Sequence, residues 1–275
     1  MNITAADVNK LRQQTGAGMM DCKQALQEAQ GDFEQAVDIL RKKGQKVAAK
    51  RSDREAGEGA VIAGTSADGT RGALIVLNCE TDFVAKNEGF VGVAQSILKT
   101  AINSGAENLD SLRSLPFDES GRSIGDKITD EIGKIGEKID LSQYDSLQGG
   151  KVVAYIHPGN RLATLVAFNK ATTDEIGKDI AMQIAAMDPI ALDENSVPKS
   201  VIDREIEVGR ELAIQEGKPA EMAEKIALGR LNKFYKESTL LNQEFIKDSK
   251  KSIKQYLQDS DKDLTVTAFF RRSLS

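Results

Sequence analysis

The chain repeats part of its own sequence after an interval of 91 residues. Without any gap, seven identical residues recur at this shift: Gly59/Gly150, Val61/Val152, Ala63/Ala154, Leu74/Leu165, Asn78/Asn169, Thr81/Thr172 and Ala94/Ala185. In both copies the pattern predicts a strand, a turn at Asp68-Gly69 or Gly159-Asn160, a second strand, a polar turn and a helix. A duplicated segment with this order predicts an α+β fold built from two related core subdomains with antiparallel sheets.

A different pattern precedes the first copy, because residues 1–54 have the spacing of three short helices. Thr4 with Asp7 forms a capping pattern for the first helix, and Asp21 and Asp32 are the expected N-caps of the second and third. We expect Gly44 to end the third helix and the basic stretch 46–54 to form a helical linker. So small a core suits a binding module better than a reaction site.

The second copy is interrupted by an insertion at residues 196–235. Gly217-Lys-Pro219 separates two helical runs whose small and apolar residues recur every three or four positions. The expected seam residues are Ile202, Ile206, Gly209 and Ala213 on the first run and Met222, Ile226 and Gly229 on the second. This spacing predicts an antiparallel helical hairpin with a narrow seam, which forms an arm.

These patterns divide the chain into five segments. We expect a helical module and linker at 1–54, an N-terminal core subdomain at 55–146, and a C-terminal core subdomain in two parts, 147–195 and 236–275, around the arm. The second part is predicted to hold a lysine-rich helix at 249–257 and a strand at 264–270, which returns to the second sheet.

Composition argues against catalysis by this chain. One His, two Cys and no Trp exclude a His-rich metal site and a Cys₄ zinc site. The single imidazole, His157, follows a strand in Tyr-Ile-His-Pro-Gly, where a structural or interface role is the usual one. No P-loop, Rossmann glycine pattern or nucleophile elbow is present. We therefore predict a protein that is not an enzyme and needs no cofactor.

Charge and hydropathy bear on location and partners. The net charge of −5 gives no global positive field for nucleic acid. The first residues lack the cationic and apolar regions of a signal peptide, and the longest apolar runs are too short to span a bilayer. We expect a reduced, cytoplasmic protein with no membrane partner.

Two segments have residues suited to a contact surface. In residues 15–20, Met19 and Met20 lie in a predicted interhelical loop, as adaptable exposed contacts or with one of them in the small core. In residues 80–86, Thr81 or Asp82 can cap the following helix. Phe83 then has two interpretations, a hydrophobic staple of that helix or an exposed aromatic wedge beside a carboxylate.

The same two segments resemble the signatures of the elongation factor Ts family. The stretches that carry the resemblance are Leu11-Arg-Gln-Gln-Thr-Gly-Ala-Gly-Met-Met-Asp-Cys-Lys-Gln-Ala-Leu26 and Asn78-Cys-Glu-Thr-Asp-Phe-Val-Ala-Lys86. Two shorter matches are His157-Pro-Gly159 with Arg161, and Gly217-Lys-Pro219 before Glu224-Lys225. The resemblance runs in order from about residue 2 to 271. It implies an N-terminal three-helix module like a ubiquitin-associated (UBA-like) domain, two related core subdomains and an inserted helical hairpin.

The resemblance also implies a function, that of guanine-nucleotide exchange factor for bacterial elongation factor Tu. In the family, the turn that corresponds to Thr81, Asp82, Phe83 and Val84 presses on the GTPase domain near its magnesium and phosphate site. Arg12, Met19 and Met20 are implied as contacts of the N-terminal module, and His157 as a contact of the C-terminal core subdomain with another domain of the partner. No direct nucleic-acid contact is expected, and a homodimer through the core or the arm is left open.

Some features depart from the family pattern and leave an alternative function open. The chain stops soon after its last strand, where family members often carry another helix, and Asn160-Arg-Leu-Ala-Thr-Leu165 replaces a more glycine-rich stretch. Basic residues at 41–54 and 247–254 are also consistent with a general protein- or ribosome-interaction module without exchange activity.

Overall fold

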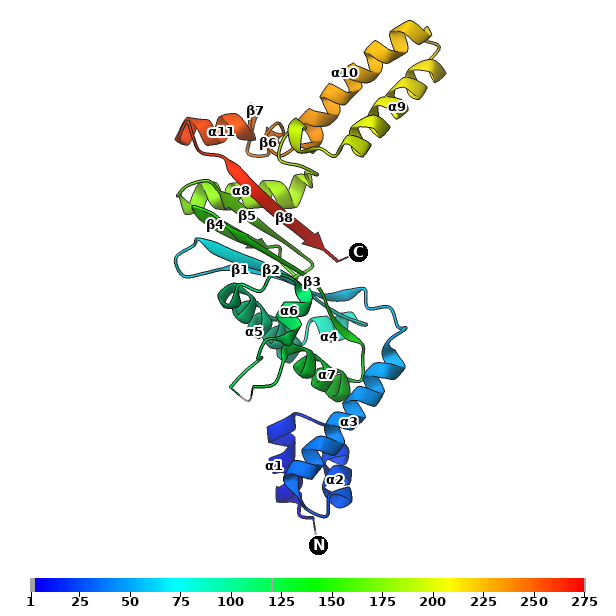
Figure 1. The fold of residues 1–275 in the computed structure, drawn as a ribbon, viewed down its shortest axis with the longest axis vertical. Helices are drawn as coiled ribbons and strands as arrows, with labels where there is room; N and C mark the ends of the chain where they lie inside the picture. Colours follow the sequence, from blue (N-terminus) through cyan, green and yellow to red (C-terminus); the bar gives the residue numbers. More distant parts are fainter. Residues whose placement is uncertain (1–2, 120, 275) are drawn as a thin grey trace. The chain divides into compact units, whose positions relative to one another are not determined.

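A computed structural model of the chain describes residues 3–119 and 121–274 and has the predicted α+β fold (Figure 1). In chain order the elements are α1 (Ala5–Thr15), α2 (Met19–Glu28), α3 (Phe33–Arg51), β1 (Glu58–Thr65), β2 (Arg71–Cys79), α4 (Asp82–Ala85), α5 (Glu88–Ser104), α6 (Leu109–Ser114), α7 (Ile124–Ile135), β3 (Ile139–Gln148), β4 (Lys151–Ile156), β5 (Leu162–Phe168), α8 (Asp174–Met187), the 3₁₀ helix η1 (Glu194–Ser196), α9 (Lys199–Gln215), α10 (Ala220–Ser238), β6 (Glu244–Phe245), β7 (Asp248–Ser252), α11 (Ile253–Ser260) and β8 (Val266–Ser273).

The chain forms two compact units. The first contains the N-terminal helices, β1 as far as Ile62, and residues 75–145. The second contains the tip of the β1–β2 hairpin (Ala63–Leu74) together with Ser146–Arg272. The division into five segments stays a prediction.

The N-terminal helices form where their caps predict. The Thr4 hydroxyl accepts from the Asp7 amide at 3.2 Å, and the Asp7 carboxylate accepts from the Thr4 amide at 3.0 Å, so the predicted capping box of α1 is confirmed. Gly16 ends α1 in the left-handed region, with φ of 70°. The three helices enclose a small core of Val8, Leu11, Cys22, Ala25, Leu26, Ala29 and Ala36.

The predicted cap of the second helix is wrong. Helix α2 begins at Met19, after Gly18, and Asp21 lies within its first turn. The Asp21 carboxylate forms an ion pair with Lys43 of α3, and a negative charge in the first turn also suits the helix dipole. Met19 and Met20 are consequently the first residues of a helix, not part of a loop.

The predicted end of the third helix is also wrong, because α3 continues through Gly44 to Arg51. Gly44 lies against Gly133 of α7, where a Cβ atom on Gly133 would come within 2.8 Å of the Gly44 Cα. The glycine therefore serves a close helix crossing instead of a C-cap. As a result, α3 is one continuous helix from the N-terminal core to Arg51, and residues 46–51 of the predicted linker are its last part.

The core of the second unit follows the strand–strand–helix order of the repeat. Its sheet has the order β4-β5-β8, and β4 pairs antiparallel with β5 from Lys151↔Phe168 to Ile156↔Ala163. Helix α8 lies along this sheet (Figure 1). The core between them and α11 contains Val166, Phe168, Ile176, Ile180, Ala181, Ile184, Leu240, Phe245, Ile253, Leu257, Leu264 and Val266. The first copy provides the other three-stranded sheet, with the order β1-β2-β3.

The two copies share a glycine that the backbone requires. A Cβ on Gly59 would lie 2.2 Å from the Leu77 carbonyl oxygen, and a Cβ on Gly150 would lie 2.3 Å from the Lys170 Cα. Both distances are far below van der Waals contact. The identity of these two positions in the 91-residue repeat therefore has a steric cause in each subdomain.

The inserted hairpin is confirmed as α9 and α10, which run antiparallel side by side (Figure 1). On α9, the predicted seam residues Gly209 and Ala213 are buried. On α10, the buried seam residues are Ala223, Ala227 and Leu231 in place of the predicted Met222, Ile226 and Gly229, and Met222 is 54% exposed. A Cβ on Gly209 would lie 3.1 Å from the Ala227 Cα, so the seam takes the alanine face because its short side chains fit this distance.

The end of the chain differs from the prediction at one element. Residues 248–252 form β7, which pairs with β6, so the helix predicted at 249–257 starts only at Ile253. The Ser252 hydroxyl accepts from the Gln255 amide and fixes this start. The predicted returning strand is β8, beside β5. Among the described residues, no helix combines the length and the apolar character needed to cross a membrane.

Candidate functional site

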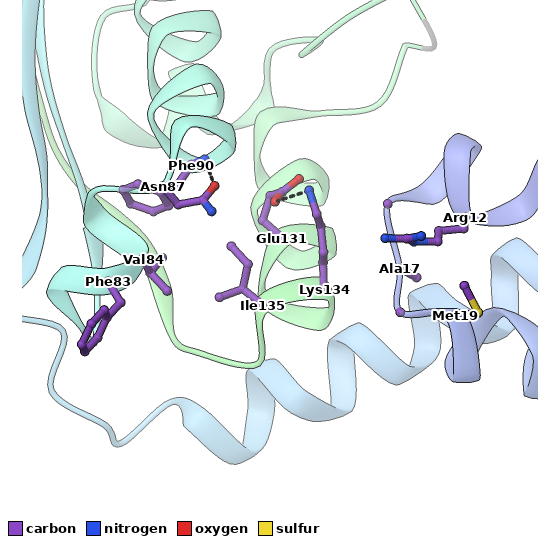
Figure 2. A pocket seen from close by; sticks show the side chains of 12 residues that line it. Arg12, Ala17, Met19, Phe83, Val84, Asn87, Phe90, Glu131, Lys134 and Ile135 are labelled. Atoms are coloured by element: carbon purple, nitrogen blue, oxygen red, sulfur yellow. Dashed lines mark hydrogen bonds and ion pairs between the residues drawn. The ribbon is translucent and has the colours of Figure 1, made fainter. Parts of the chain in front are cut away.

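The turn between β2 and α5 carries the most exposed large apolar side chain of the described residues. Thr81 caps the short helix α4, and its hydroxyl accepts from the Val84 amide at 3.4 Å. The Phe83 side chain is 83% exposed, so the staple interpretation is wrong. Val84 is half-buried, and Figure 2 shows it facing Ile135 of α7. The turn thus presents an aromatic ring to solvent and keeps a neighbouring aliphatic side chain against the protein.

Asp82 places a negative charge beside this ring. Lys86, one helical turn later, donates a hydrogen bond to its carboxylate at 2.6 Å, and this bond lowers the pKa of Asp82 below its usual value. The carboxylate is accordingly ionised at neutral pH. The ion pair is at the surface, where solvent screens it strongly, so the carboxylate can exchange Lys86 for another partner at little cost.

The turn is anchored from behind by a residue that sequence reasoning missed. The Glu137 carboxylate accepts from the Thr81 amide at 3.0 Å, the Glu80 amide at 3.2 Å and the Thr81 hydroxyl at 2.7 Å. In return, the Glu80 carboxylate binds the backbone next to Glu137: it accepts from the Lys138 amide at 2.6 Å. The same carboxylate pairs with Arg51 at 2.8 Å. We call these two crossed glutamates the carboxylate clamp. The spacing of the isoleucines in α7 indicates a helix that ends just before Glu137. No local sequence pattern, however, indicates that Glu137 contacts Thr81, 56 residues away.

Beside the turn lies a groove of about 600 Å³ within the first unit. Figure 2 shows Arg12, Ala17 and Met19 at one side of it, and Phe83 and Val84 at the other. Its lining residues are Arg12, Gly16, Ala17, Gly18, Met19, Phe83, Val84, Asn87, Phe90, Glu131, Lys134 and Ile135. Four of the residues predicted for partner binding line this groove, namely Arg12, Met19, Phe83 and Val84, and the other two residues of the predicted turn, Thr81 and Asp82, directly precede Phe83.

Charged residues of α7 lie between the two sides of the groove. The Glu131 carboxylate is buried and pairs with Lys127 at 2.9 Å and Lys134 at 3.4 Å. The methylenes of Lys134 approach Gly16, where a Cβ atom would lie 3.2 Å from the Lys134 Cε. Gly16 has a φ of 70°, a left-handed conformation that favours glycine, where the α1–α2 loop meets α7.

Two predicted residues belong neither to the groove lining nor to the turn at residues 81–84. Met20 is 74% exposed on the first turn of α2. His157 belongs to the second unit, directly after β4, where its Nδ1 lies 3.0 Å from the Tyr155 hydroxyl. Both side chains are available at the surface, and neither is part of the geometry described for the turn.

The thiol of Cys79 lies beneath the turn. Its Sγ donates to the Thr81 carbonyl at 3.2 Å, and burial, followed by the nearby Glu137 charge, raises its pKa from 9.0 to about 12. Because the folded pKa is raised, the thiol's contribution to stability is complete below its ordinary pKa and is lost as the pH rises towards 12. The side chain is therefore a protonated, inert part of the core.

We expect Cys79 and the buried Cys22 to be unreactive towards a thiol-specific chromogenic reagent at about pH 8 in the folded protein, because reaction needs an accessible thiolate. In urea, where burial is lost, both should react. The measurement is the number of thiols titrated before and after unfolding. Rapid modification of the folded protein at Cys79 would contradict the packing described beneath the turn.

The chemistry available at this site is that of a contact surface. Within the described part of the chain, no group of three or more His, Cys, Asp and Glu side chains is arranged to hold a metal ion. The surface offers an exposed phenyl ring and an ionised carboxylate on an anchored turn, with a thioether and a guanidinium across the groove. Aromatic and arginine side chains are among the residue types that most often contribute strongly to protein–protein binding.

Comparisons with known proteins identify the family of this chain. The family model for Elongation factor TS matches residues 80–275, a range that begins at the anchored turn. Proteins named elongation factor Ts are similar over nearly the whole chain. The one from Porphyromonas gingivalis is 51% identical over 275 residues, which cover 100% of this chain and 99% of that protein. The one from Amoebophilus asiaticus is 52% identical over 274 residues and 98% of each chain, and the one from Cytophaga hutchinsonii is 51% identical over 276 residues and 99% of each. This chain belongs to the elongation factor Ts family of translation elongation factors.

Proposed function

We propose that the protein is a guanine-nucleotide exchange factor that binds elongation factor Tu in its GDP form and promotes GDP release. The observation that carries the proposal is the exposure of Phe83 on a turn whose backbone is held by the carboxylate clamp. An aromatic side chain without a packing role of its own, on a rigid support, is suited to insertion into a partner. The family membership supports the same function.

The mechanism follows from linkage between two ligands of one partner. A factor that binds the nucleotide-free partner more tightly than the GDP-bound partner must weaken GDP binding by the same ratio. Each tenfold loosening of the nucleotide needs about 1.4 kcal/mol of differential binding. The chain therefore needs no catalytic group, and we propose that it is not an enzyme.

The individual residues take the following proposed roles. Phe83 inserts between elements of the GTPase domain and deforms that domain's contacts with magnesium and phosphate. Asp82 leaves its ion pair with Lys86 and binds groups of the partner that line the magnesium and phosphate site. Thr81 and Val84 hold the turn against the protein. Contacts with the partner from the N-terminal helices come from Arg12, Met19 and Met20, and His157 provides a separate contact from the second unit.

The net charge of −5 gives the chain no global positive field for nucleic acid. We propose elongation factor Tu as the partner, with no direct contact to RNA.

The test of this function is the rate of GDP release from elongation factor Tu. Labelled GDP should leave faster as the protein is added, and excess nucleotide should dissociate the complex because the coupling is reciprocal. A release rate that does not change at saturating protein would reject the proposal.

A further inference from the structure

We propose that Glu137 is the positioning residue of the turn at residues 81–84, so that the orientation of Phe83 depends on a carboxylate 54 residues further along the chain. The inference rests on the proposed exchange function and assigns the part of the fold that makes it possible. Its basis is the set of three donors that converge on one side chain: the amides of Glu80 and Thr81 and the Thr81 hydroxyl.

The three donors lie where the backbone leaves regular structure. Strand β2 ends at Cys79 and α4 begins at Asp82, so Glu80 and Thr81 connect the two elements. Both of their amides donate to Glu137 Oε2. Removal of the carboxylate leaves partly buried donors that must find water, which favours another conformation of this segment.

The Thr81 hydroxyl transmits the anchor to the next helix. It donates to Glu137 Oε1 at 2.7 Å and accepts from the Val84 amide at 3.4 Å. The short bond to the carboxylate fixes the hydroxyl, and the hydroxyl caps the first turn of α4. Phe83 lies in that turn, so its direction follows from the same contact.

Neither α4 nor Phe83 can hold this conformation alone. Helix α4 has four residues, too few for a helix to be stable by its own hydrogen bonds. The Phe83 ring is 83% exposed and so gains little from packing within the chain. The direction of the ring therefore depends on what holds the turn itself, namely the Glu137 anchor and the half-buried Val84 side chain.

The positive charge of Arg51 offsets the negative charge of Glu80 in the carboxylate clamp, which allows the two glutamates to lie side by side. Arg51 donates two hydrogen bonds to the Glu80 carboxylate, at 2.8 and 3.1 Å, and the Lys138 amide donates a third. Arg51 is the last residue of α3. The turn is thereby tied both to the segment after α7 and to the long helix that begins in the N-terminal module.

The first experiment measures, in the free protein, whether Glu137 protects the backbone amides of the turn. Amide hydrogen exchange at residues 80–84 should be at least about tenfold faster in Glu137→Ala than in the wild type, the change expected for loss of charged hydrogen bonds. The control is Glu107→Ala, which removes an exposed carboxylate of the same unit. Unchanged protection of the turn in Glu137→Ala would overturn the proposal whatever the exchange activity is.

The second experiment asks whether the anchor acts through Phe83. With elongation factor Tu at saturating protein, Glu137→Ala should slow GDP release about tenfold, and Glu137→Gln, which keeps one acceptor oxygen, should slow it less. In a Phe83→Ala background the Glu137→Ala change should have no further effect, because the ring that it positions is gone. Equal slowing in both backgrounds would show a role independent of Phe83 and would overturn the proposal.

The two experiments also distinguish a failure of this inference from a failure of the proposed function. A wild-type protein that does not accelerate GDP release rejects the exchange function, while the hydrogen-exchange comparison still decides whether Glu137 holds the turn. A wild-type protein that accelerates release, with Glu137→Ala equally active, rejects the positioning role alone.

Discussion

Replacement of Phe83 by alanine is expected to slow release of GDP from elongation factor Tu by about 30- to 100-fold at saturating protein. This range corresponds to about 2–3 kcal/mol, the usual cost of truncating an aromatic hot spot. The side chain is 83% exposed in the free protein, so its loss should leave thermal unfolding nearly unchanged. The measurement is stopped-flow fluorescence of labelled GDP, with the unfolding midpoint recorded for each variant.

The matched control for this prediction is Leu228→Ala. Leu228 is another exposed large apolar residue, at 47%, but it lies on the hairpin arm, away from the anchored turn in the sequence. We expect it to leave the release rate unchanged. If Phe83→Ala releases GDP as fast as the wild type, the ring is not the wedge; if Phe83→Ala unfolds, the ring has a packing role that its exposure does not indicate.

Replacement of Gly59 by alanine is expected to lower the free energy of unfolding by about 3 kcal/mol or more. The new Cβ would lie 2.2 Å from the Leu77 carbonyl oxygen, and Gly59 has a φ of 152°, which L-residues rarely adopt. The clash involves backbone, so it cannot be relieved by rotating a side chain. Gly150→Ala should have a comparable effect in the second copy, where the Cβ would lie 2.3 Å from the Lys170 Cα.

Urea unfolding followed by circular dichroism measures this prediction. The control is Gly92→Ala in α5, where nothing lies within 4 Å of the new Cβ. That change should stabilise the protein by up to about 1 kcal/mol through helix propensity alone. Were Gly59→Ala or Gly150→Ala as stable as Gly92→Ala, the two glycines of the repeat would have no steric role and the backbone approach described for the sheets would be wrong.

Most of the fold could be predicted because its determinants are local in sequence. The capping box of Thr4 with Asp7, the strand–turn–strand order of the repeat and the Gly217-Lys-Pro219 break each act over a few residues. The errors came where a distant contact overrides a local signal. Asp21 resembles a cap but pairs with Lys43, and Gly44 resembles a helix end but meets Gly133.

The candidate site could be predicted only in part for the same reason. The segment 81–84 is visible in the sequence, yet a capped helix with a packed phenylalanine and one with an exposed phenylalanine have the same local pattern. Only the structure shows that Phe83 is exposed. The anchor at Glu137 has no sequence signature, because a glutamate that accepts three hydrogen bonds cannot be distinguished in the sequence from a glutamate exposed to solvent.

We propose above all that this protein weakens the binding of GDP to elongation factor Tu. The most direct measurement is the dissociation rate of labelled GDP from that partner at increasing protein concentration, with unlabelled nucleotide in excess. We expect a rate that rises and saturates with wild-type protein and a much smaller rise with Phe83→Ala. A dissociation rate that stays at its spontaneous value at every concentration, while the two proteins form a complex, would contradict it.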